Sequence, residues 1–167
     1  MDKLIALFVL LLPSQLKIAL LRACGAQIGK GCRIGFSLIS ARKINLSDNV
    51  YIGHFNLIWR LDRLEMGSGS RVTLMNWITG GAKGTFRLGS CSSVSVLHFL
   101  EASGNIEIGA NTIIAGRGSQ FFTHGITPDN LNDVSPIRIG DWCYIGSAAR
   151  FVPGSGLAEG TFLGMGA

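Results

Sequence analysis

Between residues 137 and 167 the hydrophobic positions recur with a fixed period of six. Ile139, Ile145, Phe151, Leu157 and Leu163 keep this spacing, and a small residue or a valine follows each of them. Neither the 3.6-residue repeat of an α-helix nor the two-residue alternation of a single strand produces such a period. It is typical of a parallel β-helix, in which each hexad forms one short face and three faces complete a triangular coil.

The same period extends towards the N-terminus, with interruptions. Its further members are Ile28, Ile34, Leu46, Ile52, Ile58, Leu64, Leu88, Val94 and Leu100. Ile108 and Ile114 then lie two residues out of step, and 25 residues instead of 24 separate Ile114 from Ile139. Such slips mark loops that leave the coil, and loops on a rigid scaffold often carry function. We therefore predict an all-β fold, with a parallel β-helix over residues 26–167 and a loop excursion over about 116–136.

Residues 1–25 follow a different pattern. Leu4–Leu12 is an unbroken apolar run of nine residues, which is too short to span a bilayer, and Pro13 ends it. Ser14 then offers an N-cap to a helix. One face of that helix would carry Leu16, Ala19, Leu20 and Ala23. Because no small-residue cleavage site follows the run, we expect a helix that either lies on a membrane surface or caps the first coil.

The composition fits one domain with a sizeable core, because 47% of the 167 residues are hydrophobic. The net charge of +5 at pH 7 favours an anionic partner: a nucleic acid, a phospholipid or a cofactor that bears phosphate. The Lys and Arg residues are spread along the chain without interleaved aromatic residues, which argues against nucleic acid. The cysteines have no metal-binding spacing, and we interpret them as reduced packing residues of a cytoplasmic protein. They are Cys24, Cys32, Cys91 and Cys143.

Three histidines are the main candidates for chemistry. His54, His98 and His124 are 44 and 26 residues apart, so no close pair exists and the spacing disfavours a metal site. His124 lies in the second slip. A neutral imidazole on such a loop can take a proton from an attacking hydroxyl or amine near pH 7, as the general base of an acyl transfer. His98 is open to both a structural and a chemical role, and we interpret His54 as a residue of the coil surface.

The segments around His124 resemble a known family. They are Ile106–Gly109 (IEIG), Ser119–His124 (SQFFTH), Ile137–Asp141 (IRIGD), Tyr144–Ser147 (YIGS) and Pro153–Gly154. Together with the hexads, these segments make residues 28–167 similar to the hexapeptide-repeat acyltransferases, which fold as a left-handed β-helix. The similarity is closest to O-acetyltransferases of bacterial surface-polysaccharide synthesis. The left hand is expected from this resemblance alone, since parallel crossovers otherwise prefer the right hand.

The resemblance implies a homotrimer with active sites between subunits, which transfers an acetyl group from acetyl-CoA to a sugar of a surface polysaccharide or its precursor. His124 would be the general base, and the backbone N–H of Ser147 would face the thioester oxygen. His98 or Glu101 would orient the acceptor or the base, with Asp129 as a weaker candidate. The residues expected to bind the donor are Gly146, Ser147, Arg150 and Arg117. The resemblance implies no metal.

Alternatives remain open at this point. The chain could be a non-catalytic β-helix that serves as a scaffold, or the acceptor could be the amino group of an amino sugar. Members of the family usually carry further hexads, so we also expect the sequence to be incomplete after Ala167. We expect a cytoplasmic protein, with peripheral contact to the inner membrane through residues 1–24 if the helix binds lipid.

Overall fold

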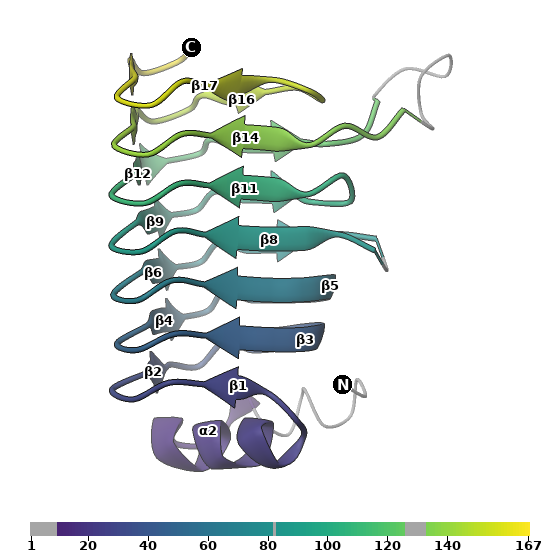
Figure 1. Cartoon of the computed structure of the whole chain (residues 1–167), viewed down its shortest axis with the longest axis vertical. Helices are drawn as coiled ribbons and strands as arrows, with labels where there is room; N and C mark the ends of the chain where they lie inside the picture. Colours follow the sequence, from purple (N-terminus) through teal and green to yellow (C-terminus); the bar gives the residue numbers. More distant parts are fainter. Residues whose placement is uncertain (1–9, 82, 126–132) are drawn as a thin grey trace.

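The chain is a left-handed parallel β-helix of about six turns, with one short helix at its N-terminal end (Figure 1). This computed structural model describes residues 10–81, 83–125 and 133–167. Helix α2 (Ser14–Ala23) lies beneath the first coil, and the coils stack in sequence order above it. The predicted fold class is confirmed.

Each coil has three faces, and parallel strands stack in register on each of them. Face 1 consists of β2 (Arg33–Ile34), β4 (Tyr51–His54), β6 (Arg71–Leu74), β9 (Ser93–Val96), β12 (Ile113–Arg117), β15 (Tyr144–Ile145) and β18 (Phe162–Leu163). Face 2 consists of the first halves of β3 (Leu38–Leu46) and β5 (Leu57–Met66), then β7 (Trp77–Thr79), β10 (Phe99–Glu101), β13 (Gln120–Phe122) and β16 (Arg150–Phe151). Face 3 consists of β1 (Gln27–Ile28), the second halves of β3 and β5, then β8 (Thr85–Leu88), β11 (Ile106–Ile108), β14 (Ile137–Ile139) and β17 (Gly156–Leu157).

Inward-facing side chains stack directly above one another to form the core. On face 1 the register aligns Ile34, Ile52, Val72, Val94, Ile114, Ile145 and Leu163. The first six of these are at most 1% exposed. Full burial of such a side chain stabilises a fold by about 1.5–3 kcal/mol. The hydrophobic anchors of the hexads are therefore the side chains that hold successive coils together.

The larger insertions lie at the corner between faces 2 and 3, which we name the loop corner. Between faces 3 and 1, successive inward residues are six positions apart, from Ile28 and Ile34 to Leu157 and Leu163. At the loop corner the spacing is eight residues between Ile58 and Met66 and eighteen between Phe121 and Ile139. In Figure 1 the described parts of these insertions lie at one edge of the stack.

This arrangement corrects two predictions from the period. In the sequence, the period of six ran from Leu64 to Leu88 without a slip. In the structure Leu64 and Met66 both face inward, and Leu88 of the next coil is aligned with Met66 instead of Leu64. The loop excursion was expected over 116–136. It is shorter, because β13 (Gln120–Phe122) still lies on face 2 and the chain leaves the coil only after it.

A buried polar row runs inside the corner between faces 1 and 2. Its members are Ser37, Asn56, Asn76, His98 and Ser119, each at most 2% exposed. Each accepts a hydrogen bond from the backbone of the next coil. Oδ1 of Asn56 accepts from the N–H of Asn76 (2.9 Å), and Oδ1 of Asn76 accepts from the N–H of His98 (3.0 Å). The row satisfies buried backbone groups where the chain turns, as a tight interior requires.

Helix α2 caps the first coil, but through a different face from the predicted one. Ile18 and Leu21 pack into the core, and Lys17 is buried beside them. Nζ of Lys17 donates to the carbonyls of Leu10 and Gly35, which compensates for burying the ammonium group, and burial lowers the pKa of Lys17. Most of the predicted apolar face points away from the coil, because Leu16, Ala19 and Ala23 are exposed, whereas Leu20 packs against the core.

Ser14 also differs from its expected role. It is the first residue of α2, and its hydroxyl accepts from the backbone N–H of Ile34 (2.9 Å) instead of capping the helix. Ser14 therefore joins the helix to the first coil. Within the residues that the structure describes, no helix is long and apolar enough to cross a bilayer.

Candidate active site

The candidate site lies at the loop corner, where face 2 ends in two neighbouring coils. Glu101 is the last residue of β10, and it pairs with Phe122, the last residue of β13 in the coil above. His124 follows two residues later. Its backbone pairs antiparallel with Val134, and the N–H of Gly125 donates to the carbonyl of Asp133 (2.9 Å). The returning chain thus holds His124 in place at the base of the loop.

The imidazole of His124 has one nitrogen engaged and the other directed at a carboxylate. Nδ1 lies 2.7 Å from the carbonyl oxygen of Gly125. Because a carbonyl can only accept, Nδ1 carries the proton in the neutral ring and Nε2 keeps its lone pair. Nε2 lies 3.9 Å from Oε2 of Glu101, and the side chain of His124 is 35% exposed. A base with this tautomer and access to solvent can receive a proton at Nε2.

The carboxylate of Glu101 is held by the backbone and by a threonine. Oε1 accepts from the N–H of Ser103 (2.9 Å), and Oε2 accepts from the hydroxyl (2.8 Å) and the N–H (3.3 Å) of Thr123. Glu101 is 7% exposed and Thr123 is fully buried. These three hydrogen bonds hold the carboxylate in one position, with Oε2 facing Nε2 of His124. It is positioned to stabilise a positive charge on His124.

A row of aromatic side chains on face 2 leads to the histidine. The ring of Trp77 meets Phe99 edge-on at 5.1 Å between centroids, and Phe99 lies 5.4 Å from Phe122. Phe122 in turn meets His124 edge-on at 6.2 Å. Aromatic side chains therefore form a continuous row on the outer surface of face 2 as far as the candidate site.

His98, expected to orient the acceptor or the base, is not brought to His124. It belongs to the buried polar row, where its Nδ1 accepts from the N–H of Ser119 (3.1 Å) and its side chain is 1% exposed. Burial lowers the pKa of His98 from 6.5 to about 4. The ring is therefore neutral at physiological pH, and its hydrogen bond with Ser119 stabilises the turn between faces 1 and 2. Of the two expected partners of His124, only Glu101 is at the site.

The residues expected to bind the donor gather at a different corner, between faces 1 and 2. The N–H of Arg117 donates to Oγ of Ser147 (3.3 Å), and the carbonyl of Arg117 accepts from Ala148 (2.9 Å). Gly146 is buried, and its carbonyl accepts from the hydroxyl of Ser119 (3.3 Å). Ser147 comes just before β16 and His124 just after β13, and these strands pair in parallel. The two residues therefore lie at opposite ends of face 2 within one chain.

Arg150 is exposed, but much of its guanidinium is used by the backbone. Nη1 donates to the carbonyls of Ala148 (2.8 Å), Gly118 (2.9 Å) and Ala149 (3.2 Å). Arg150 thus fastens the corner between faces 1 and 2. Arg117, whose side chain is also exposed there, is the better placed of the two for a phosphate group.

Two residues of the site were missed by the sequence-based prediction. Thr123 supplies two donors to Glu101, and the carbonyl of Gly125 selects the tautomer of His124. Thr123 precedes His124 directly, so its position was a usable signal, whereas a backbone carbonyl leaves none. Asp129 lies outside the described residues. Across residues 10–81, 83–125 and 133–167, no group of three His, Cys, Asp or Glu side chains could hold a metal ion.

Comparisons with known proteins do not add a family to this picture. No protein-family model matches the chain, and a search of curated proteins finds no significant match.

Proposed function

We propose that the protein is an acetyl-CoA-dependent O-acetyltransferase that acts on a hydroxyl of a sugar in a surface polysaccharide or its precursor. The observation that supports it is the position of Nε2 of His124, a side chain that is 35% exposed, 3.9 Å from the buried carboxylate of Glu101. The solenoid fold is compatible with acyl transfer. The resemblance of the loop segments to polysaccharide O-acetyltransferases favours a sugar hydroxyl as the acceptor.

In the proposed reaction His124 removes the proton of the acceptor hydroxyl while the oxygen attacks the thioester carbonyl carbon. The new C–O bond forms, the C–S bond breaks, and the proton held on Nε2 passes to the leaving thiolate. Glu101 stabilises the imidazolium between these two transfers. The base favours a hydroxyl over an amine, because a neutral amine is already a good nucleophile, whereas a hydroxyl needs its proton removed.

A trimer would join the two halves of the site. His124 and Ser147 lie at opposite ends of face 2 in one chain, so the backbone N–H of Ser147 can serve a thioester near His124 only from a neighbouring subunit. Three copies with face 2 turned towards a common axis would place the loop corner of one chain beside the face 1–face 2 corner of the next. In that arrangement Arg117 would be available for the phosphates of acetyl-CoA.

Replacement of the base tests this proposal. In a thiol-release assay with acetyl-CoA and a panel of sugar acceptors, His124→Ala should lower kcat by about 10²–10⁴-fold, the usual contribution of a general base. Binding of CoA should persist, because His124 is not among the donor-binding residues. Glu101→Gln should lower kcat by about tenfold or more while KM for acetyl-CoA stays constant, since its charge acts on the imidazolium alone.

His54→Ala is the matched control, because His54 is a half-buried histidine on face 1, away from the loop corner. It should retain activity. Failure of the wild-type protein to release CoA with every sugar acceptor would favour the scaffold alternative. Activity only with amino sugars, insensitive to His124→Ala, would favour N-acetylation.

A further inference from the structure

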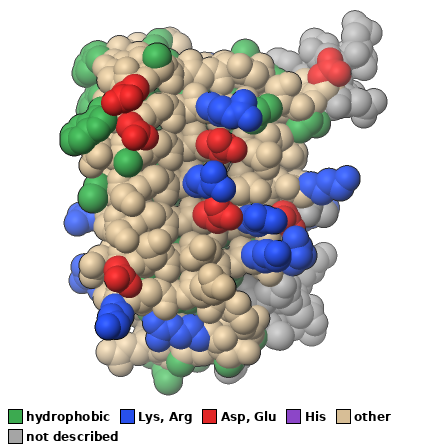
Figure 2. Space-filling view, in the orientation of Figure 1, with side chains coloured by type: hydrophobic (Ala, Val, Ile, Leu, Met, Phe, Trp, Pro, Cys, Tyr) green, Lys and Arg blue, Asp and Glu red, His purple; other side chains and the backbone are tan. Residues whose placement is uncertain are grey.

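Lys and Arg occur along the whole chain, but the net positive charge comes from its N-terminal part, where acidic residues are nearly absent. Residues 3–47 contain seven Lys and Arg and no Asp or Glu, whereas residues 48–167 contain eight Lys and Arg and nine Asp and Glu. Because the coils stack in sequence order, the six cations of residues 3–47 that lie in the described residues belong to α2 and the first two coils. Figure 2 shows blue and green side chains at this end of the visible face.

One exposed side of α2 is apolar where a cap is normally polar, although Gln15 and Arg22 of the helix are also exposed. Terminal caps of solenoids generally present a polar outer face, which keeps the end of the stack in water. Here Leu11 is 75% exposed and Leu16 is 59% exposed, and Ala19 and Ala23 are exposed on the same side of the helix as Leu16. No acidic residue occurs in α2. In the sequence, the apolar run Leu4–Leu12 immediately precedes Pro13 and this helix.

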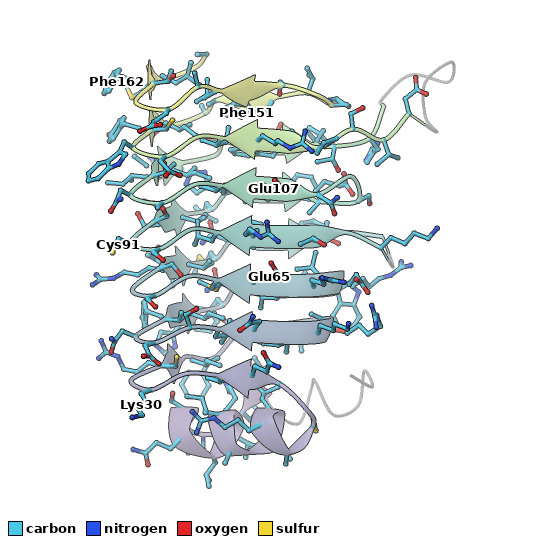
Figure 3. The ribbon with its side chains drawn as sticks, in the orientation of Figure 1. Lys30, Glu65, Cys91, Glu107, Phe151 and Phe162 are labelled. Carbon is cyan, nitrogen blue, oxygen red and sulfur yellow. The ribbon has the colours of Figure 1, made fainter. Side chains whose placement is uncertain are left out.

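The helix is fixed to the coil, so this surface has a defined orientation. Nη2 of Arg22 donates to the carbonyls of Ile28 (2.6 Å) and Gly29 (2.8 Å), and Lys17 is anchored in the interior. Around the rim, Lys30 and Lys43 are exposed, and Lys30 projects from the edge of the first coil (Figure 3). An apolar helical face beside a ring of cations is the pattern of helices that lie in the interface of a bilayer.

We propose that this end of the solenoid docks on an anionic phospholipid bilayer, with Leu11 and Leu16 entering the interface and Lys30 and Lys43 meeting the lipid phosphates. The positive charge of this end favours an anionic bilayer as its binding partner. A second copy docked end to end would oppose two surfaces of the same sign, which is unfavourable. Stacked strands rise by about 4.8 Å per coil, so the candidate site would stand roughly 15–20 Å above the first coil, farther still from α2, and remain clear of the headgroups. This inference does not depend on the proposed acetyl transfer.

Sedimentation with vesicles tests the proposal on the full chain. The protein should partition onto vesicles that contain phosphatidylglycerol and much less onto pure phosphatidylcholine, and binding should weaken as salt is raised. Leu16→Glu should lower the partition coefficient by about tenfold or more, because it places a charge in the interface. Lys30→Gln with Lys43→Gln should lower it by about 25-fold, at about fivefold for each cation near the surface.

Lys83→Gln with Arg138→Gln is the matched control, since it removes two exposed cations from higher coils. Its partition should stay within about twofold of wild type, because these charges lie beyond a Debye length from the surface. Circular dichroism should show that all variants keep their β-structure. Equal binding to both vesicle types, or no effect of Leu16→Glu, would overturn the proposal. Self-association that Leu16→Glu abolishes, without vesicle binding, would also overturn it.

Discussion

At the residue scale, two histidines of the same chain have opposite roles because their surroundings differ. His124 is a third exposed, and its Nε2 is directed at a carboxylate. His98 is enclosed in the polar row between two coils, where Asn56 and Asn76 occupy the equivalent positions below it. The burial of His98 lowers its pKa to about 4, since a charged ring would lose its hydration there. Of these two histidines, only His124 has a side chain that solvent can reach.

His98→Asn should remove a pH dependence of stability. Between pH 6.5 and about 4 the unfolded chain binds a proton at His98 that the folded chain does not, so wild-type stability should fall as pH drops through this window. The full loss from this group is about 3 kcal/mol. The asparagine introduced by this substitution would repeat the role of Asn76, so the variant should match wild type at pH 7 and lose much less at about pH 4.5 in urea unfolding. The same pH dependence in both proteins would contradict this assignment.

The sequence singled out the candidate residues but not the contacts between them. His124 was identified from the slip in the hexads and from the SQFFTH segment, and Glu101 from its position about one coil earlier. Which of His98 and Glu101 reaches His124 could not be decided, because that depends on whether a residue sits inside a corner or at the end of a face. The period alone left this open, since the loop corner changes length from coil to coil. The tautomer depends on the carbonyl of Gly125, which has no side-chain signature.

At the element scale, the tight corner between faces 3 and 1 depends on left-handed backbone. The residue three positions before each face-1 anchor has a positive φ. These residues are Gly31, Asn49, Gly69, Cys91, Asn111, Trp142 and Gly160. Gly and Asn adopt this conformation readily, whereas other residues do so at a cost of about 1–2 kcal/mol. The six-residue spacing at this corner could be read from the sequence because the turn leaves no room for insertion.

Cys91→Asn should therefore stabilise the fold. Cys91 is exposed with φ of 57°, and it projects from the same edge of the solenoid as Lys30 (Figure 3). Asparagine should relieve the backbone strain and raise the free energy of unfolding by about 0.5–1 kcal/mol. Cys24→Asn is the control, because Cys24 is also exposed but has φ of −83°. Urea unfolding should show the gain only for Cys91→Asn, and an equal gain in both variants would point to removal of a thiol instead.

At the scale of the whole molecule, the three faces have different surfaces. Face 3 carries a row of alternating charges, in which Arg87 pairs with Glu65 (2.8 Å) and Arg138 with Glu107 (3.6 Å), and Figure 2 shows this row of blue and red side chains. Face 2 carries the aromatic row that ends at His124, and the adjoining corner adds exposed Phe55, at 65%. A charged face is well hydrated, whereas an exposed row of aromatic side chains is typical of a protein–protein interface. The asymmetry supports association through face 2.

Trp77→Glu should break the proposed trimer. Trp77 is 50% exposed in the single chain and lies in the middle of the aromatic row, so a charge there would be buried without a partner if face 2 turns towards a three-fold axis. Light scattering should give three times 17.8 kDa for wild type and one chain mass for the variant. Trp142→Glu is the matched control, because Trp142 is 64% exposed at the corner between faces 3 and 1, and it should remain trimeric. Acetyl transfer should be lost with the trimer, because Ser147 and His124 of one chain cannot meet. A monomeric wild type that is fully active would contradict both the interface and the shared site.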